Sequence, residues 1–365
     1  MRSLKTLCVI AAIAIATPAA AQWKDSPEIK ALYEAAKKEG KVIIWGTARA
    51  EVEWIPAAFN AVFPGIEVEF LGDNDIATKA IAEARAGRHQ IDVFWSSLTA
   101  IMPVMQRDLI AVTDWTPFGI NKAGTGYDGR MALTSNIAYA FAYNSEQVKK
   151  EDLIKDWGEA TDPKYKGKMT ASLFLLPRMI GGLSLAWGKD KAAQFARDLM
   201  ANSDLLLTRA PREPMLQSGE RLYGLGEVDS LVRQWTRSGM KIDSVIPQPV
   251  VLGQFGATVM AKAPHPNAAK LLAGWMASPE GKKAKETATS QTDYGPTGTS
   301  ELAKLIHSGK VQVVFDTLEN MSQREAAIRA RHRAGRTSSC TRPRAGRVPR
   351  ASARRRKRKI RRDAA

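Results

Sequence analysis

The hydrophobic and polar positions along the chain follow helical and strand periods in turn after residue 22. Ser26 followed by Pro27 is typical of a helix start, and the apolar residues that follow recur at i, i+3, i+4 and i+7 until Gly40. Short apolar or alternating runs predict strands at 42–45, 66–70 and 91–95, with helical patterns between them at 55–62 and 77–84. This order predicts a parallel sheet with helices on its faces, and therefore an α/β fold.

Polar side chains follow the first and third predicted strands. Thr47 and Arg49 follow the strand at 42–45, and Ser96 and Ser97 follow the strand at 91–95. In open α/β sheets, ligands bind beyond the carboxyl ends of the strands, near helix N-termini. We therefore expect these residues to line a binding site. The alternative is that the hydroxyl groups only cap helices.

The charge of the chain is concentrated at its two ends. Residues 324–365 carry 17 Lys or Arg against two acids, and residues 1–21 add two basic residues, whereas residues 22–323 carry 35 basic and 35 acidic residues. The length of 365 residues predicts about two domains, and the composition is that of a folded soluble protein. Both cysteines, Cys8 and Cys340, lie near the ends, which excludes a disulfide or a cysteine-bound metal from the body of the chain.

The first 21 residues are typical of a secretory signal. Arg2 and Lys5 precede an apolar run at 7–16, and small residues at 19–21 offer a cleavage site. Ten apolar residues cover about 15 Å as a helix, against about 30 Å for a membrane core, so a membrane-spanning anchor is excluded. We therefore expect export.

The C-terminal segment, residues 324–365, has the composition of a disordered Arg-rich tail. Only Ile328, Val348 and Ile360 are Val, Ile, Leu or Phe, too few to bury a core. Its charge alone would also suit binding to nucleic acid or to a membrane surface, although an exported protein rarely meets nucleic acid. Our hypothesis is that a frameshift replaced the natural C-terminus from near Arg324. The alternative reading frames of the gene should then encode a C-terminal helix.

An enzyme is not favoured by the motifs of the chain. Residues 124–129 match Gly-x-Gly-x-x-Gly, but no strand precedes them and no amphipathic helix follows, so we expect a flexible loop. The chain has no Gly-x-Ser-x-Gly elbow, no phosphate-binding loop and no metal-binding helix motif. Its four histidines have no paired spacing, so surface or capping roles are expected for them. We predict no catalysis, no cofactor and no metal.

Three segments resemble a known family. They are 32–42 running into Trp45, then 217–220 followed by 223–226, and 263–272 continuing through 275–281. They resemble the periplasmic substrate-binding proteins of ABC importers, in the solute-binding group that includes ferric-iron and phosphonate binders. The resemblance spans about 23–320. It implies two α/β lobes, joined by strands, that close on a solute by hinge motion and deliver it to an inner-membrane permease.

The resemblance also implies the arrangement of the lobes. We expect lobe 1 at 23–138 plus 250–320 and lobe 2 at 139–249, with crossing strands near 138–144 and 250–260. The protein is expected to be a periplasmic monomer with the type II periplasmic binding protein fold.

The solute class remains open between three alternatives. The iron-binding relatives use adjacent tyrosines, whereas Tyr223 is preceded by Leu222. A cationic solute such as a polyamine would need acids, for which Glu51, Asp92 and Asp229 are available. We favour an organic or phosphorylated anion, because an arginine grips a carboxylate or phosphate with two parallel N–H bonds. Arg209 is a further candidate, and Trp45 and Trp95 could stack on a flat ligand. The residues predicted to bind the solute are Thr47, Arg49, Ser96, Ser97, Asn136, Arg178, Arg212 and Tyr223.

Overall fold

The computed structural model describes residues 23–73, 75–291, 298 and 300–315. The predicted signal peptide at 1–21 and the Arg-rich tail at 324–365 lie outside the described residues. The description below therefore concerns the body of the chain, which belongs to one compact unit.

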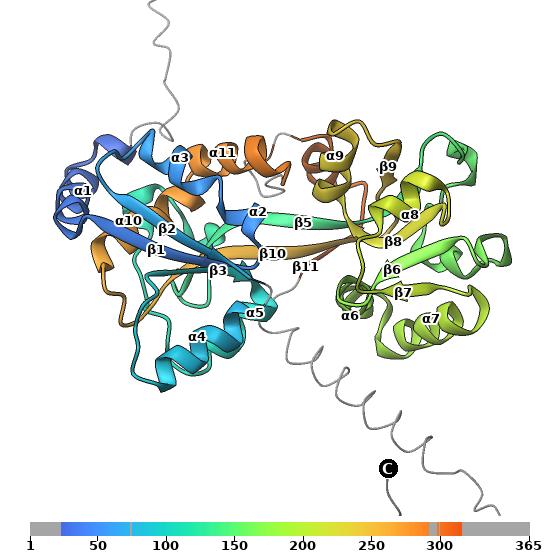
Figure 1. Cartoon of the computed structure of the whole chain (residues 1–365), viewed down its shortest axis with the longest axis horizontal. Helices are drawn as coiled ribbons and strands as arrows, with labels where there is room; N and C mark the ends of the chain where they lie inside the picture. The colour runs from blue at the N-terminus through green and yellow to red at the C-terminus, as the bar shows by residue number, and fades with distance from the viewer. Residues whose placement is uncertain (1–22, 74, 292–297, 299, 316–365) are drawn as a thin grey trace, which may run out of the picture. The chain divides into compact units, whose positions relative to one another are not determined.

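A long mixed sheet runs through this unit, in the order β2-β1-β3-β10-β5-β8-β6-β7, with β11 beside β10 and with β4 and β9 beside β5 (Figure 1). The first group of strands is β1 (Lys41–Gly46), β2 (Glu67–Gly72), β3 (Val93–Ser97), β4 (Thr125–Gly126), β10 (Val250–Val259) and β11 (Val313–Phe315). The second group is β6 (Met169–Ser172), β7 (Leu206–Thr208), β8 (Tyr223–Val228) and β9 (Ile242–Val245).

Strand β5 (Met131–Asn144) belongs to both groups. Its residues up to Ala138 pair with β10, and its residues from Tyr139 onwards pair with β8 and β9. Strands β1, β2 and β3 are parallel to one another, as are β6, β7 and β8. The predicted parallel sheet with helices is thus confirmed, and the α/β class with it.

Helices cover both faces of the first group of strands. The α-helices are α1 (Pro27–Glu39), α2 (Arg49–Val52), α3 (Ile55–Asn60), α4 (Ile76–Arg85), α5 (Leu98–Met105), α6 (Leu175–Trp187), α7 (Lys189–Asn202), α8 (Glu213–Ser218), α9 (Asp229–Arg237), α10 (Pro266–Ala277), α11 (Pro279–Thr289) and α12 (Glu301–His307). Val93 and Trp95 of β3 join the core cluster that includes α1 and α10, whereas Phe94 joins the cluster of α4 and α5. Figure 1 shows α4 and α5 together on one side of these strands.

The short 3₁₀-helices lie mostly in connections. They are η2 (Trp23–Asp25), η3 (Thr116–Phe118), η4 (Lys122–Gly124), η5 (Lys150–Asp152), η6 (Trp157–Thr161) and η7 (Pro163–Tyr165). Among the described residues, no helix combines the length and the apolar composition that a membrane crossing requires.

The start of α1 follows the predicted chemistry. The Ser26 hydroxyl accepts a hydrogen bond from Ile29 N at 3.2 Å, Pro27 occupies the first turn, and Gly40 ends the helix in the left-handed region at φ 77°. This left-handed end favours glycine because it has no Cβ. The predicted helix is confirmed.

The Gly-rich motif at 124–129 is a hairpin rather than a flexible loop. Residues 125–126 form β4, which pairs with the start of β5, and the turn between them places Tyr127 and Asp128 at φ 59° and 54°. A strand follows the motif where a dinucleotide-binding fingerprint needs a helix. The motif therefore carries no dinucleotide site.

The start of α10 is bonded to the end of α1. The helix starts at Pro266, and two of its first N–H groups donate to α1. Glu39 accepts hydrogen bonds from Asn267 N at 3.2 Å and from Ala268 N at 2.8 Å. The side chain of His265 contacts the buried Asp92, with Nδ1 and Oδ2 2.8 Å apart. Glu39 thus ties the start of α10 to α1, and His265 ties it to the segment before β3.

Candidate functional site

The carboxyl ends of both groups of parallel strands point toward the middle of β5. Strand β8 is antiparallel to β5, and its last residue, Val228, lies opposite Tyr139. Strand β3 ends at Ser97, which pairs with Phe255 of β10, and Phe255 in turn pairs with Ser135 of β5. Tyr139 lies four positions after Ser135 on β5, which is about 13 Å at about 3.3 Å per residue. The two sets of carboxyl ends therefore face each other along β5.

The loops after β1 and β3 are joined directly. The hydroxyl oxygens of Thr47 and Ser96 are 2.5 Å apart, and Ser96 is buried. Ser97 is the last residue of β3 and immediately precedes α5, and its hydroxyl oxygen lies 2.9 Å from that of Thr99. The structure thus brings together the three hydroxyl residues that we predicted at this edge. The hydroxyl group of Ser96 is hydrogen-bonded to that of Thr47, whereas Ser97 is partly exposed.

Arg49 begins α2 and points along the surface. Its side chain is 75% exposed, its Nε lies 3.1 Å from Glu53, and its guanidinium lies 5.3 Å from the centre of the Phe70 ring. The backbone at Arg49 packs so closely on β2 that a Cβ at Gly72 would lie 2.2 Å from Arg49 N. Only glycine fits there, so β2 fixes the position of the first turn of α2.

The second group of strands offers an apolar turn and an arginine. Ser172 Oγ accepts hydrogen bonds from the N–H groups of Phe174 and Leu175, both at 3.2 Å, so the end of β6 turns sharply into α6. The Phe174 side chain is exposed, and the Arg209 guanidinium lies 5.3 Å from the centre of its ring. Arg209 follows the last residue of β7, Thr208. An exposed arginine therefore stands at the carboxyl ends of this group also.

Arg212 has a structural partner instead of a free guanidinium. It forms two hydrogen bonds to Glu227, one from Nε and one from Nη2 at 2.9 Å, and Glu227 is fully buried. Burial raises the pKa of Glu227, and the guanidinium of Arg212 opposes that effect. Because the Nε and Nη2 groups of Arg212 are already bonded to Glu227, we no longer count Arg212 among the residues proposed to bind the solute.

Tyr223 lies at the opposite end of β8 from the carboxyl edge. Its ring stacks on Phe141, with centroids 5.2 Å apart, and meets the edge of Tyr165 at 5.1 Å. Burial raises the pKa of Tyr223, and it raises the pKa of Tyr165 to about 12. A phenolate ligand is therefore disfavoured at both positions. Tyr223 is a core residue in this structure and also leaves the set.

The two remaining predicted residues lie nearer the crossing. Asn136 lies on β5 opposite Gln254 of β10, and it is 9% exposed. Arg178 is half-buried in the first turns of α6. Both stay predictions. Trp95, which we considered for stacking on a flat ligand, is fully buried and unable to reach a solute.

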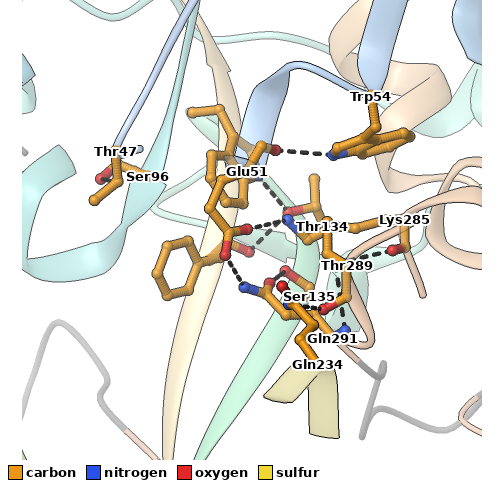
Figure 2. Close-up of polar contacts among 12 residues, drawn as sticks. Thr47, Glu51, Trp54, Ser96, Thr134, Ser135, Gln234, Lys285, Thr289 and Gln291 are labelled. Atoms are coloured by element: carbon orange, nitrogen blue, oxygen red, sulfur yellow. Dashed lines mark hydrogen bonds and ion pairs between the residues drawn. The ribbon is translucent and has the colours of Figure 1, made fainter. Parts of the chain in front are cut away.

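A buried polar cluster supports α2 from beneath, and the sequence did not reveal it (Figure 2). Glu51 of α2 accepts hydrogen bonds from Lys285 Nζ at 3.1 Å and from Gln291 Nε2 at 2.7 Å. Gln291 in turn accepts one from the Ser135 hydroxyl at 3.1 Å. Lys285 is 1% exposed, and its Nζ lies 3.7 Å from the centre of the Trp95 ring. Burial lowers the pKa of Lys285, and Glu51 opposes this shift.

The end of α11 also contacts α9, which follows β8. Gln234 Nε2 donates to Thr289 O at 2.5 Å, as seen in Figure 2, and Arg237 donates to the Ser290 hydroxyl at 2.5 Å. Lys285 and Thr289 belong to the same helix, α11. Helix α11, whose Lys285 binds Glu51, is thereby hydrogen-bonded to α9, the helix that follows β8.

The acids that a cationic solute would need are already engaged. Glu51 contacts Lys285 and Gln291, and the buried Asp92 accepts from Ile43 N at 2.8 Å and from His265 N at 2.7 Å. Asp229 accepts from the Ser244 hydroxyl at 3.0 Å and lies 2.9 Å from Arg233. Across the described ranges, no group of three or more His, Cys, Asp or Glu side chains is placed to hold a metal ion.

Two hollows lie elsewhere on the first group of strands. One, of about 430 Å³, is lined by residues of the hairpin at 125–129 and of 113–122. The other, of about 270 Å³, is lined by residues of 80–91, 108–109 and 260–262. Neither includes a residue that we predicted to bind the solute.

The family of the chain follows from comparison with known proteins. The family model of the bacterial extracellular solute-binding proteins matches residues 45–283. No curated protein sequence matches the chain.

Solved structures share the fold at low identity. Iron-bound HitA from Pseudomonas aeruginosa aligns with a TM-score of 0.67 at 15% identity, over 81% of this chain and 99% of its own. AfuA from Actinobacillus pleuropneumoniae, with fructose-6-phosphate bound, aligns with a TM-score of 0.62 at 20% identity, over 80% and 97%. The substrate-binding protein of an ABC transporter from Agrobacterium tumefaciens gives 0.64 at 14% identity, over 81% and 96%.

These neighbours are two-lobed periplasmic binding proteins, so the predicted type II fold is confirmed. The resemblance noted in the sequence is confirmed as well, because the family model covers most of the chain. This chain belongs to the bacterial extracellular solute-binding proteins of ABC transporters.

Proposed function

We propose that this protein captures a small organic or phosphorylated anion in the periplasm and delivers it unchanged to an ABC permease. In this proposal the solute lies between the carboxyl ends of the two groups of strands. Lobe 1 comprises 23–138 and 250–320, lobe 2 comprises 139–249, and β5 and β10 connect them. The observation that carries the proposal is the position of Arg49 and Arg209, one exposed arginine beyond each group of strands.

Both arginines are suited to hold an anion. Each guanidinium lies 5.3 Å from the centre of an aromatic ring, Phe70 for Arg49 and Phe174 for Arg209. Such stacking orients the guanidinium and leaves its N–H edges open to an oxyanion. The pair of Arg49 with Glu53 is an exposed i,i+4 contact, which is worth only about 0.3–0.5 kcal/mol. Arg209 forms no ion pair within the described ranges.

The neutral groups beside the arginines also suit an anion. Thr47, Ser97 and Thr208 place hydroxyl groups at the carboxyl ends of β1, β3 and β7. The acids that were available to a cationic solute are held by other side chains and backbone groups. AfuA, which shares the fold, has been solved with fructose-6-phosphate bound, so a phosphorylated anion is compatible with this architecture.

Ferric iron is the alternative, because HitA has been solved with iron. The phenols that we associated with iron do not support it. Tyr223 is buried against Phe141 at the end of β8 away from the carboxyl edge. An iron site in this protein would need other ligands.

Isothermal titration calorimetry of the purified full chain tests the proposal. The probes are fructose 6-phosphate, phenylphosphonate, benzoate, ferric citrate and spermidine. We expect saturable one-site binding of at least one organic anion, weakened about tenfold or more by Arg49→Ala and by Arg209→Ala. Arg197→Ala on the exposed face of α7 is the matched control and should leave binding unchanged. Binding of ferric citrate or spermidine alone would overturn the proposal, as would anion binding that ignores both variants.

A further inference from the structure

Two neighbouring apolar side chains stand exposed where the solute is proposed to bind. In the described part of the chain, the exposed large apolar side chains are Val112, Leu173, Phe174, Met200 and Leu305. Leu173 is 36% exposed and Phe174 56%. They are consecutive, and they follow the last residue of β6, Ser172. Single exposed apolar residues need no explanation, but an adjacent pair at a ligand-binding edge does.

The backbone holds this pair in place. Leu173 N donates to Thr208 O at 2.9 Å, which extends the pairing of β6 with β7 by one residue. The next two N–H groups, of Phe174 and Leu175, donate to Ser172 Oγ. Three consecutive N–H groups are therefore bonded. The two side chains project from an anchored turn, which fixes where they can meet a ligand.

The adjacent charge determines what the pair can bind. The Arg209 guanidinium covers part of the Phe174 ring, at 5.3 Å from its centre. An apolar surface that carries a cation at one edge is complementary to a molecule with an apolar body and an anionic end. A hydrophilic sugar phosphate would use the arginine but would leave Leu173 and Phe174 unburied.

We infer that the solute is an anion whose charged group is attached to an aromatic or similarly flat apolar body. This inference rests on the proposed function and names its solute class. Phe174 and Leu173 bind the flat body, with the ring of Phe174 available for offset stacking. Arg209 binds the carboxylate, phosphonate or phosphate group. Phe174 is thus a residue that determines specificity, whereas Arg209 supplies the affinity that any anion would use.

A matched pair of probes separates the two roles. Phenylphosphonate and methylphosphonate carry the same anionic group and differ in the apolar body. We expect the full chain to bind phenylphosphonate at least tenfold more tightly in calorimetric titration. Phe174→Ala should reduce this preference to about twofold, while loss of its stacking on Arg209 should weaken the binding of both probes by a similar factor. Phe174→Leu should keep an intermediate preference, because the leucine buries apolar area but does not stack.

Two further variants serve as controls. Met200→Ala removes an equally exposed apolar side chain from α7, and it should change neither affinity. Arg209→Ala should weaken both probes by a similar factor. Circular dichroism confirms that each variant is folded, which the exposure of Phe174 favours.

The outcomes distinguish this inference from the proposed function. Equal affinity for the two probes, or a preference that survives Phe174→Ala, overturns the aromatic platform and leaves an anion-binding protein. Failure of every anion to bind overturns the proposed function itself. A dimer in sedimentation analysis that dissociates in Phe174→Ala would show that a second copy of the chain covers this turn, and it would also overturn the inference.

Discussion

Glu51→Gln removes the negative partner of a buried lysine and tests how α2 is held. Lys285 is 1% exposed, and Glu51 Oε2 at 3.1 Å is its ion-pair partner. The substitution keeps the size of the side chain and an oxygen that can accept a hydrogen bond. It removes the charge that compensates the buried ammonium group.

The expected cost follows from the burial of the two partners. Removing one partner of a buried ion pair costs about 3–5 kcal/mol, because the other charge stays uncompensated. The side chain of Glu51 is 23% exposed, and the π-face of Trp95 lies 3.7 Å from Lys285 Nζ. Both features lessen the loss, so we expect Glu51→Gln to lower the free energy of unfolding by about 2–3 kcal/mol.

Urea denaturation followed by circular dichroism measures this loss, and a double-mutant cycle assigns it. Lys285→Met removes the buried charge and leaves Glu51 bonded to Gln291. The double variant should be more stable than the sum of the two single losses predicts, by at least about 1 kcal/mol. Additive losses, or a cost of Glu51→Gln below about 0.5 kcal/mol, would refute the view that this ion pair holds α2 in place.

Three other predictions concern pH, packing and the second ion pair. Burial lowers the pKa of Lys285 from its ordinary value of 10.5, so the unfolded chain binds more protons between the two pKa values. The free energy of unfolding should therefore rise with pH in that window more steeply in the wild type than in Lys285→Met; equal slopes in urea titrations would contradict this. Gly72→Ala places a Cβ 2.2 Å from Arg49 N, and calorimetry should show at least fivefold weaker anion binding. Arg212→Met leaves the buried Glu227 without its partner and should lower the free energy of unfolding by about 3 kcal/mol or more in urea titrations, whereas a change below about 1 kcal/mol would show that Glu227 is compensated in another way.

The order of strands and helices in the first 100 residues was predictable because their apolar residues recur at a helical or strand period or form short apolar runs. Strand β1, for example, alternates buried and partly buried positions, and Ser26 caps α1 as its sequence suggests. The edge of the sheet at which we propose the solute to bind was predictable as well. Once the strands are placed, a topological rule locates their carboxyl ends, and with them Thr47 and Ser97.

The direction of β8 could not be predicted, because the sequence analysis did not identify this strand. Tyr223 was chosen without knowing that β8 begins at this residue and runs away from it. Its ring therefore lies in the core instead of at the carboxyl edge. Arg212 was misjudged because its partner, Glu227, is 15 residues later in the chain.

Lys285 was missed because its helix does not have an apolar face in the sequence. The buried positions of α11 are Gly281, Lys285 and Thr289, four residues apart. Such a stripe indicates a solvent-exposed helix by hydrophobicity alone. Its burial depends on Glu51 and Trp95, which lie about 200 residues earlier in the chain, so only the tertiary structure reveals it.

Hydrogen–deuterium exchange with and without saturating phenylphosphonate tests the central claim most directly, because it reports which backbone segments a bound solute protects. We predict simultaneous protection of the loops after β1 and β3 and of the loops after β6, β7 and β8, with the hollow around 113–129 unaffected. Protection confined to one group of strands, or to that hollow, would contradict the claim that this protein holds an anion between the carboxyl ends of both groups.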